Sequence, residues 1–538
     1  MRRSDLIAGI SVAGLMLPEA VAYAGIAGLP PQRAIFAAFA GCLVYALIGR
    51  SRFAIVSPTS SSAAILAATF AAIPGSAADK GVLATVAVAF AGLLFLLASI
   101  ARLGGITGFI SRPVLRGFAF GLAITIIVKQ LPDLAGVRVH AADIGHLLIA
   151  LAGAIPRWNV VSLVTGVAAL AALVGLRRLP ALPGAMIVLA LGIAASVAFH
   201  LPARGVAVVG AIDVSMTWPS LSHLGWMDLS RLAQFTLPLV LILFAESWGT
   251  IRALALRHGD RIDANREIGA LGMANLASAL VQGMPVGAGF SAGTANETAG
   301  ASSRAAALIA CAGLAVLILF CRPWLAQLPQ PVLAAVVIAA LSHALDPAPL
   351  LRLWRIDRDQ YVALGAAAGV IAFGVLNGML IAIALSVAAL VRRLASPHLA
   401  QLGRLGTSHD FVDMARHADA VPVPGILIWR PSQPLFFANA DSMLGTIAAQ
   451  SQPAQCHAII LSLEESFDLD STALDALGEC DAQLARAGVR MQLARVHDHV
   501  RDALEKGGLA DLLARSSYSV DDAVQALVGG APPEGRSP

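Results

Sequence analysis

Two acidic residues inside long apolar segments are the first places in this sequence where chemistry is expected. Glu19 follows Pro18 in the apolar run 7–23, and Glu246 lies in the middle of the run 234–256. An ionisable group at the centre of a membrane-spanning helix costs at least about 2.5–3.5 kcal/mol, so it usually serves a function. Because an apolar environment favours the neutral carboxyl, both residues are candidates to carry a proton or bind a coupling cation. The structural alternative is a carboxylate that reaches the membrane interface or pairs with an arginine.

Two short segments rich in small and hydroxyl-bearing residues interrupt the apolar pattern, one in each half. Residues 57–62 read Ser-Pro-Thr-Ser-Ser-Ser, and residues 287–294 read Gly-Ala-Gly-Phe-Ser-Ala-Gly-Thr. Each opens a short helix after a Pro or Gly break, and the N-terminus of such a helix presents free N–H groups and about half a positive charge. Small residues also allow close helix packing. The matching positions of the segments favour an inverted repeat with an anion site between two broken helices.

The elements that must position these residues are membrane helices. The 538 residues are 57% hydrophobic and only 13% charged, against about 25% charged in soluble domains. The apolar runs lie in residues 1–395, a transmembrane domain. We expect a linker at 396–419, a small α/β domain at 420–528 and a disordered tail at 529–538. The net charge of +4 does not favour nucleic acid, and the five scattered cysteines have no metal-ligand spacing, so we expect no metal or cofactor.

Apolar runs separated by polar breaks predict an all-α membrane domain of fourteen spans. The expected spans are 7–23, 33–49, 59–74, 80–101, 112–130, 158–176, 183–200, 234–256, 265–281, 290–299, 303–321, 330–343, 360–373 and 376–393. Arginines gather in the loops that follow even-numbered spans. Since positive loops face the cytoplasm, both termini and the soluble domain are expected there.

Several segments resemble the SulP family of sulfate-permease-like anion transporters, as a bacterial inner-membrane member with a C-terminal STAS domain. The resemblance lies in Leu17-Pro18-Glu19-Ala20, Ala27-Gly28-Leu29-Pro30-Pro31, Ser57-Pro58-Thr59, Ile110-Ser111-Arg112-Pro113, His258-Gly259-Asp260, Phe290-Ser291 with Asn296, and Leu435-Phe436-Phe437 with Asp468-Leu469-Asp470-Ser471-Thr472. It covers nearly the whole chain. It implies a seven-plus-seven inverted repeat split into core and gate bundles, an elevator-like movement of the core, and a homodimer.

The resemblance also implies roles for individual residues. The anion would lie between Thr59 and Ser60 on one side and Phe290, Ser291 and Ala292 on the other. Glu246 falls where relatives carry an acidic residue tied to proton or sodium coupling, and Glu19 replaces a common glutamine. Many members carry arginine where this chain has Ala292. Without that charge, a monovalent anion or a carboxylate becomes more favourable than sulfate.

The C-terminal part alternates strands and helices. We expect a hairpin of 426–429 with 435–437, helices at 440–449, 472–486, 498–506 and 520–527, and strands at 457–463 and 489–493. In related stand-alone STAS proteins the segment at Ser471 and Thr472 is a phosphorylation switch. The alternative is that these residues, with Asp470, only cap a helix.

The sequence therefore predicts a secondary active transporter of a small anion, working as a proton symporter. Carboxylates or dicarboxylates, bicarbonate and sulfate are the candidate substrates. The alternatives are an uncoupled anion exchanger or channel, and sodium-coupled bicarbonate uptake. We do not expect an enzyme, because that would need convergent acid–base or metal-binding groups among the apolar spans.

Overall fold

The chain divides into two compact units, Met1–Val387 and Ala388–Pro538. The computed structural model describes residues 3–72, 77–104, 112–139, 141, 143–178, 184–211, 225–356, 359–395, 398–451 and 456–529. The predicted tail from residue 530 onward and the motif residues Ile110 and Ser111 lie outside these ranges.

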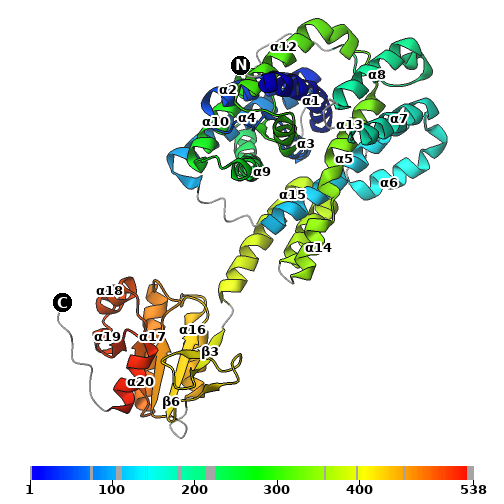
Figure 1. The fold of residues 1–538 in the computed structure, drawn as a ribbon. Coiled ribbons are helices and arrows are strands. Elements are labelled where there is room, and N and C mark those ends of the chain that lie inside the picture. The colour runs from blue at the N-terminus through cyan, green and yellow to red at the C-terminus, as the bar shows by residue number, and fades with distance from the viewer. Residues whose placement is uncertain are drawn as a thin grey trace. The chain divides into compact units, whose positions relative to one another are not determined.

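The first unit is built of helices (Figure 1). Six helices of the described residues are long and apolar enough to cross a membrane. They are α1 (Arg3–Ala27), α2 (Pro31–Ile48), α4 (Ala77–Ile100), α5 (Arg112–Ala135), α9 (Trp226–His258) and α12 (Ala305–Leu325). The shorter ones are α3 (Ser60–Ala72), α6 (Ile144–Gly153), α7 (Val160–Leu176), α8 (Gly184–Ala198), α10 (Ala264–Leu280), α11 (Phe290–Thr298), α13 (Gln330–Leu341) and α14 (Ala348–Arg355).

All fourteen expected spans overlap helices of the structure. The last two fall within α15 (Gln360–Ala395), which is interrupted at Gly374, where φ is +80°. Glycine alone adopts this backbone conformation readily, so it permits the sharp break between the two arms. Helices α6, of 10 residues, and α14, of 8 residues, were not expected, because both lie in stretches that were read as loops between apolar runs.

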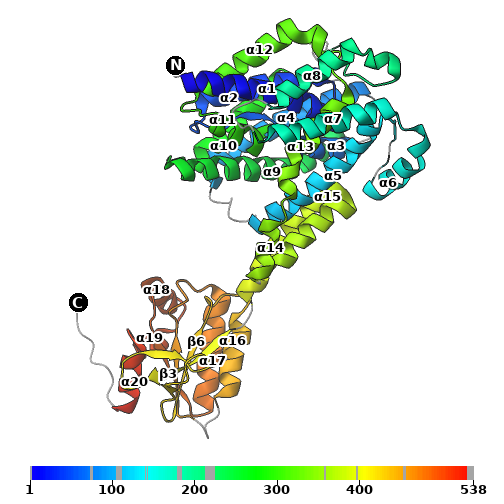
Figure 2. The same ribbon diagram turned by 45° about the vertical axis from the view of Figure 1, so that its right-hand side comes forward.

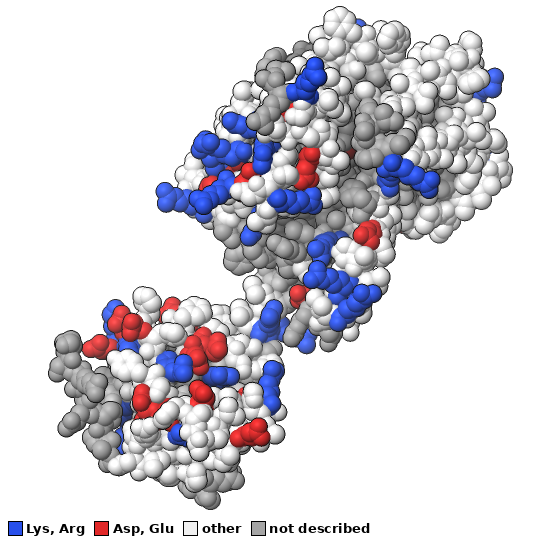
Figure 3. Space-filling view, in the orientation of Figure 1, with Lys and Arg blue, Asp and Glu red and all other residues white. Residues whose placement is uncertain are grey.

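The outer surface of the first unit is largely apolar. Phe320 and Leu319 are each 74% exposed, and Ile149 is 73% exposed. On the face seen in Figure 3, Lys and Arg gather around the ends of α2, α9 and α10 and over α14, and much of the remaining surface is uncharged. Exposed apolar area of this extent suits a lipid environment, where no water has to be displaced.

The second unit is an α/β domain around one mixed sheet. Its strands are β3 (Leu399–Leu405), β4 (Phe411–Asp413), β5 (Ala420–Val421), β6 (Ile426–Pro431), β7 (Ala458–Ser462), β8 (Arg490–Ala494) and β9 (Ser516–Ser517). The order is β4-β3-β6-β7-β8-β9, with β5 paired to β3. Strands β6 to β9 are parallel, and β3 joins β6 in antiparallel register.

Alternation along the strands gives this sheet two apolar faces. Trp429 of β6 packs with α16 (Ala440–Gln450), α17 (Ser471–Arg486), α18 (Asp498–Lys506) and α19 (Ala510–Ala514). Ile426 and Ile428, which point to the other face, pack with α20 (Val520–Val528). Figure 2 shows α16 and α17 on one side of the strands and α20 on the other.

Two expectations for this unit were wrong. The segment 396–419, expected as a linker, contains β3 and β4, which belong to the sheet. The hairpin of 426–429 with 435–437 does not form, since β6 pairs with β3 and β7 instead. Residues 435–437 lead into α16, and there the Phe436 N–H donates to Asn439 Oδ1 at 3.0 Å. Both errors arise because strand partners distant in sequence were not visible from local apolar runs. The other helices and strands expected in this second unit are confirmed within two residues at each end.

Candidate anion site

Two short strands join the broken helices of the first unit. Strand β1 (Val56–Pro58) pairs antiparallel with β2 (Val286–Ala288), with Ser57 opposite Gly287. Helices α3 and α11 begin at Ser60 and Phe290, two residues after these strands. Both helices contact α1 and α9, and they lie between those two helices in Figure 2. The structure therefore brings together the two hydroxyl-rich segments, which are more than two hundred residues apart in sequence.

The start of α3 is held by reciprocal side-chain contacts. The Thr59 N–H donates to Ser62 Oγ at 3.1 Å, and the Ser62 N–H donates to Thr59 Oγ1 at 3.2 Å. The Ser62 hydroxyl also lies 3.1 Å from the carbonyl oxygen of Pro285, just before β2. This arrangement satisfies two of the free N–H groups of the helix start, as a capping box does. Ser62 was part of the predicted segment, but its capping role was missed.

Helix α9 contacts the first broken helix and the second strand through neighbouring residues. The Thr59 hydroxyl donates to Glu246 Oε2 at 3.3 Å. The next residue, Ser247, is fully buried, and its hydroxyl accepts the Ala288 N–H at 2.9 Å. Ser247 was also missed, although a small polar residue beside a mid-helix glutamate is the signal that could have identified it.

Helix α1 makes the equivalent contact with the other broken helix. The Ser291 hydroxyl donates to Glu19 Oε1 at 2.9 Å, and Glu19 is only 5% exposed. Glu19 of the first half thus contacts the start of α11 in the second half, while Glu246 of the second half contacts the start of α3 in the first. The same carboxylate-to-hydroxyl contact occurs twice, each time across the two halves.

Neither carboxylate is neutralised by a cation. Across the part of the chain that the structure describes, Glu19 and Glu246 form no ion pair with Lys, Arg or His. The structural alternative of an arginine partner therefore finds no support among these residues. Glu19 has one hydroxyl contact, with Ser291, and Glu246 has two, with Thr59 and Ser61, whereas an ionised carboxylate can accept about four hydrogen bonds.

The other predicted residues differ in their surroundings. Thr59 and Ser60 are buried, Ser291 is half-buried, and Phe290 is 41% exposed. Ala292 is 1% exposed and belongs to the apolar core of the unit. Thr59 and Ser291 thus have a carboxylate neighbour and Phe290 is accessible, whereas Ser60 is buried and Ala292 packs into the apolar core.

The predicted regulatory segment of the second unit lies at the start of α17. Asp470 is the cap, with its Oδ1 accepting the Ala473 N–H at 2.9 Å and its Oδ2 accepting the Phe437 N–H at 2.7 Å. Ser471 and Thr472 are exposed. Capping is therefore done by Asp470, and the two hydroxyl residues are not needed for it.

Known proteins match this chain over almost its full length. Residues 3–367 match the sulfate permease family, and residues 417–523 match the STAS domain. A probable sulfate transporter of Mycobacterium tuberculosis is 33% identical over 534 residues, covering 98% of this chain and 95% of its own. Sulfate transporter 4.1, chloroplastic, of Arabidopsis thaliana is 26% identical and covers 97% of this chain and 79% of its own.

Solved structures show the same fold. The murine Solute Carrier 26 family member A9 anion transporter in the inward-facing state superimposes with a TM-score of 0.89 at 20% identity, covering 98% of this chain and 91% of its own. The transmembrane domain of the cyanobacterial bicarbonate transporter BicA gives a TM-score of 0.60 at 21% identity over 71% of this chain and 97% of its own. With its apolar helices, paired broken helices and terminal α/β domain, this chain belongs to the sulfate permease family of membrane anion transporters, ends in a STAS domain and is not an enzyme.

Proposed function

We propose that this protein is a secondary active transporter that moves one small anion together with a proton, with the anion bound between the starts of α3 and α11. The observation that carries the proposal is the pair of carboxylates, Glu19 and Glu246. Each is hydrogen-bonded to the first hydroxyl residues of a broken helix, and neither has a cationic partner among the described residues.

The charge of the site favours a particular class of anion. Two helix N-termini contribute about half a positive charge each. Ser60 adds a hydroxyl donor, and the Thr59 and Ser291 hydroxyls, which here donate to Glu246 and Glu19, can turn to the anion once those carboxyls are protonated. A total of about one positive charge from the helix ends matches a monoanion, such as bicarbonate or a carboxylate, better than a compact dianion. Sulfate and dicarboxylates, the first of which is named for several relatives, would need the second charge to be balanced by protons.

Proton coupling follows from the position of the carboxylates. An anion bound beside an ionised carboxylate meets a like charge, so its binding favours the neutral, protonated form. By linkage, protonation favours anion binding to the same extent. Glu246 would then act at the Thr59 side of the anion and Glu19 at the Ser291 side. A sodium ion bound at the same carboxylates would couple transport in the same way.

Movement of the site is proposed to be elevator-like. Helices α1, α3, α9 and α11 contact one another around the β1–β2 pair, so they can be displaced as one body. We further propose that the two halves form a seven-plus-seven inverted repeat, that the protein is a homodimer in a bacterial inner membrane, and that both termini and the STAS domain are cytoplasmic, as the arginine-rich loops favour. The membrane domain would end near residue 395. Phosphorylation at Ser471 or Thr472 would place charge at an exposed helix start.

Uptake into proteoliposomes tests the coupling. Purified protein is reconstituted, and uptake of labelled bicarbonate, succinate and sulfate is measured with an inward proton gradient, with an inward sodium gradient and with neither. Accumulation above equilibrium only with the proton gradient is expected. Flux of the native protein that is indifferent to both gradients would instead indicate an uncoupled exchanger or channel, and accumulation driven only by sodium would indicate sodium symport.

Competition identifies the substrate class. Unlabelled sulfate, bicarbonate, chloride, nitrate and C4-dicarboxylates are added in turn to the uptake assay. Because the site has no fixed cation among its described residues, we expect a monoanion or carboxylate to compete better than sulfate at equal concentration. Strong competition by sulfate alone would contradict the charge argument.

A further inference from the structure

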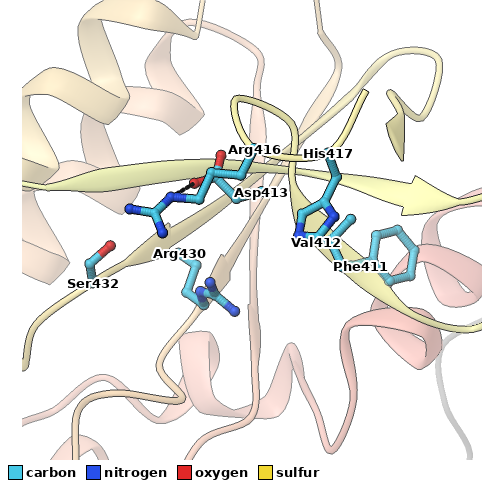
Figure 4. Close-up of a pocket in the computed structure, with 7 residues that line it drawn as sticks. All are labelled: Phe411, Val412, Asp413, Arg416, His417, Arg430 and Ser432. Carbon is cyan, nitrogen blue, oxygen red and sulfur yellow. Dashed lines mark ion pairs between the residues drawn. The ribbon is translucent and has the colours of Figure 1, made fainter. Parts of the chain in front are cut away.

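A polar cavity lies in the STAS unit, far in sequence from the carboxylates of the first unit. It has a volume of about 340 Å³ and opens beside the sheet where β6 ends. Figure 4 shows its lining, which comprises Phe411, Val412, Asp413, Arg416, His417, Arg430 and Ser432. Strand β4 and the turn after it supply one side, and the end of β6 supplies the other.

The Arg430 guanidinium of β6 is incompletely paired among the described residues. Its Nε is buried and has no hydrogen-bond partner among the residues that the structure describes. Its Nη1 lies 3.9 Å from Glu464 Oε2, which is too long for a hydrogen bond. The other oxygen of Glu464 is taken by Arg495 at 3.1 Å. The Arg430 side chain is 31% exposed and lines the cavity, so its outer nitrogens, not the buried Nε, can meet an anionic ligand there.

The opposite side of the cavity carries a second weakly paired arginine. Arg416 Nε lies 4.0 Å from Asp413 Oδ2, and the Arg416 side chain is 84% exposed. His417 follows it in the same turn, and Figure 4 shows both side chains entering from the β4 side. Two arginines and a histidine therefore line one cavity in which Asp413 is the single lining carboxylate.

The cavity has an apolar wall as well. The Phe411 ring lines it, and the guanidinium carbon of Arg404 lies 4.9 Å from the centroid of this ring. The volume is in the range of about 300–1,000 Å³ that small-molecule sites occupy, and is much larger than a bare inorganic oxyanion needs. A carbon skeleton can contact Phe411 while an anionic group meets the guanidinium groups.

We propose that this cavity binds a small organic anion bearing a phosphoryl or carboxylate group, with Arg430 and Arg416 as its charged contacts. Arginine presents a planar set of donors that matches both kinds of group with two parallel hydrogen bonds. His417 and Ser432 supply further donors at the rim. The ligand is either an anion that the protein also transports or a phosphorylated metabolite that it does not transport. In both cases the STAS unit would sense anion concentration separately from the transport site.

Calorimetric titration of the full-length protein in detergent micelles tests the proposal. The probes are succinate, 3-phosphoglycerate and inorganic phosphate. We expect one of the two organic probes to bind, with inorganic phosphate weaker. Arg430→Gln should weaken binding at least tenfold, and Arg416→Gln should weaken it several-fold. Arg486→Gln, which removes an exposed arginine from the end of α17, should have no effect.

The control variants separate the two sites. Ser291→Trp fills the proposed transport site and should leave binding to the STAS cavity unchanged. Binding that survives Arg430→Gln and Arg416→Gln when these are combined with Ser291→Trp, or loss of all binding in Ser291→Trp alone, would assign the ligand to the membrane unit and overturn the proposal, as would no binding of any probe. If Arg430→Gln lowers the unfolding temperature, the binding measured for Arg416→Gln tests the proposal instead, because the Arg416 side chain is exposed and contributes little to the stability of the fold. Uptake assays with the bound probe then show whether it is also transported.

Discussion

Carboxylates in the first unit fall into two groups that differ in how completely the protein satisfies them. Asp5, at the start of α1, accepts hydrogen bonds from the N–H and hydroxyl groups of Ser302 and Ser303 at 2.7–3.1 Å. Glu267, at the start of α10, accepts from the Tyr45 hydroxyl and from the Arg50 N–H. Glu19 and Glu246 lie in the middle of their helices and accept hydroxyl contacts alone, from Ser291 for Glu19 and from Thr59 and Ser61 for Glu246, with no backbone N–H donor among the described residues.

This difference separates carboxylates with a structural role from those proposed to bind and release a proton or cation. Asp5 and Glu267 connect segments far apart in sequence, and their oxygens are occupied by fixed protein donors. Glu19 and Glu246 retain acceptor capacity, so a proton or cation can still be gained and lost there. Position in the helix alone would have suggested this division, and the contacts strengthen it. The predictions below test it, beginning with the largest expected effect.

Filling the site should abolish transport. Ser291→Trp and Thr59→Trp each place a large ring at a broken-helix start, where the anion is proposed to bind. We expect uptake to fall to the level of empty liposomes, while the amount of protein in the membrane is unchanged. Phe320→Trp, at an exposed position of α12, is the matched control and should transport normally. Normal uptake in both site variants would refute the placement of the site.

Replacing Glu246 or Glu19 should uncouple anion transport from the proton gradient without unfolding the protein. Glu246→Gln and Glu19→Gln keep the side-chain shape and an acceptor for the serine or threonine hydroxyl, but they cannot exchange a proton. We expect accumulation driven by a proton gradient to fall at least tenfold, while anion exchange at equal pH persists. Glu297→Gln, which removes a carboxylate paired with Arg257 and His258 at the end of α11, should retain proton dependence. Proton-driven accumulation at the native level in both glutamine variants would contradict the division.

A structural carboxylate should show the opposite result. Glu267→Gln leaves the buried Tyr45 hydroxyl and the Arg50 N–H with a weaker acceptor, which costs about 1–3 kcal/mol. We expect a lower unfolding temperature in micelles, measured by intrinsic fluorescence, with the proton dependence of the remaining uptake unchanged. Tyr45→Phe should lower the unfolding temperature in the same direction. If Glu267→Gln kept the native unfolding temperature but lost the proton dependence of uptake, Glu267 would belong with Glu19 and Glu246 as a coupling carboxylate.

The smallest effect is expected in the STAS unit. Burial opposes ionisation of Asp521, but the contact with His409 at 2.6 Å and the charge of Arg404 at 2.7 Å outweigh it and hold the pKa of Asp521 below its ordinary value. Since this pKa is lower in the folded state, the ionised carboxylate stabilises the unit above the unfolded pKa of about 4. That stabilisation is lost as the pH falls through the folded pKa.

Asp521→Asn tests this on the full-length protein. Hydrogen exchange of β3 and α20, which Arg404 and Asp521 connect, should be faster in the variant at pH 7. The difference should shrink as the pH is lowered below about 4. A difference that stays constant over that range would show that the charge of Asp521 contributes nothing to the contact.

Much of the fold could be predicted from sequence, because helix length and apolar runs are local properties. Pro58 and Gly289 marked the helix breaks, and Glu19 and Glu246 were visible as charges within apolar runs. The contacts of Thr59 with Glu246 and of Ser291 with Glu19 join residues 187 and 272 positions apart, and no local pattern encodes them. Strand β3 was missed for the same reason, because it is recognised as a strand only through its pairing with β6, which is distant in sequence.

The pairing of β1 with β2 has a consequence for ion size. The backbone pairing of the two strands places Ser57 opposite Gly287. The two helix starts therefore keep their relative position unless the strands change register. The distance between the backbones of Thr59 and Ser291 is therefore set by the main chain and not by side-chain rotamers. Substitutions between small residues at those positions would change which groups face the proposed site while leaving the backbone separation of the two helix starts the same.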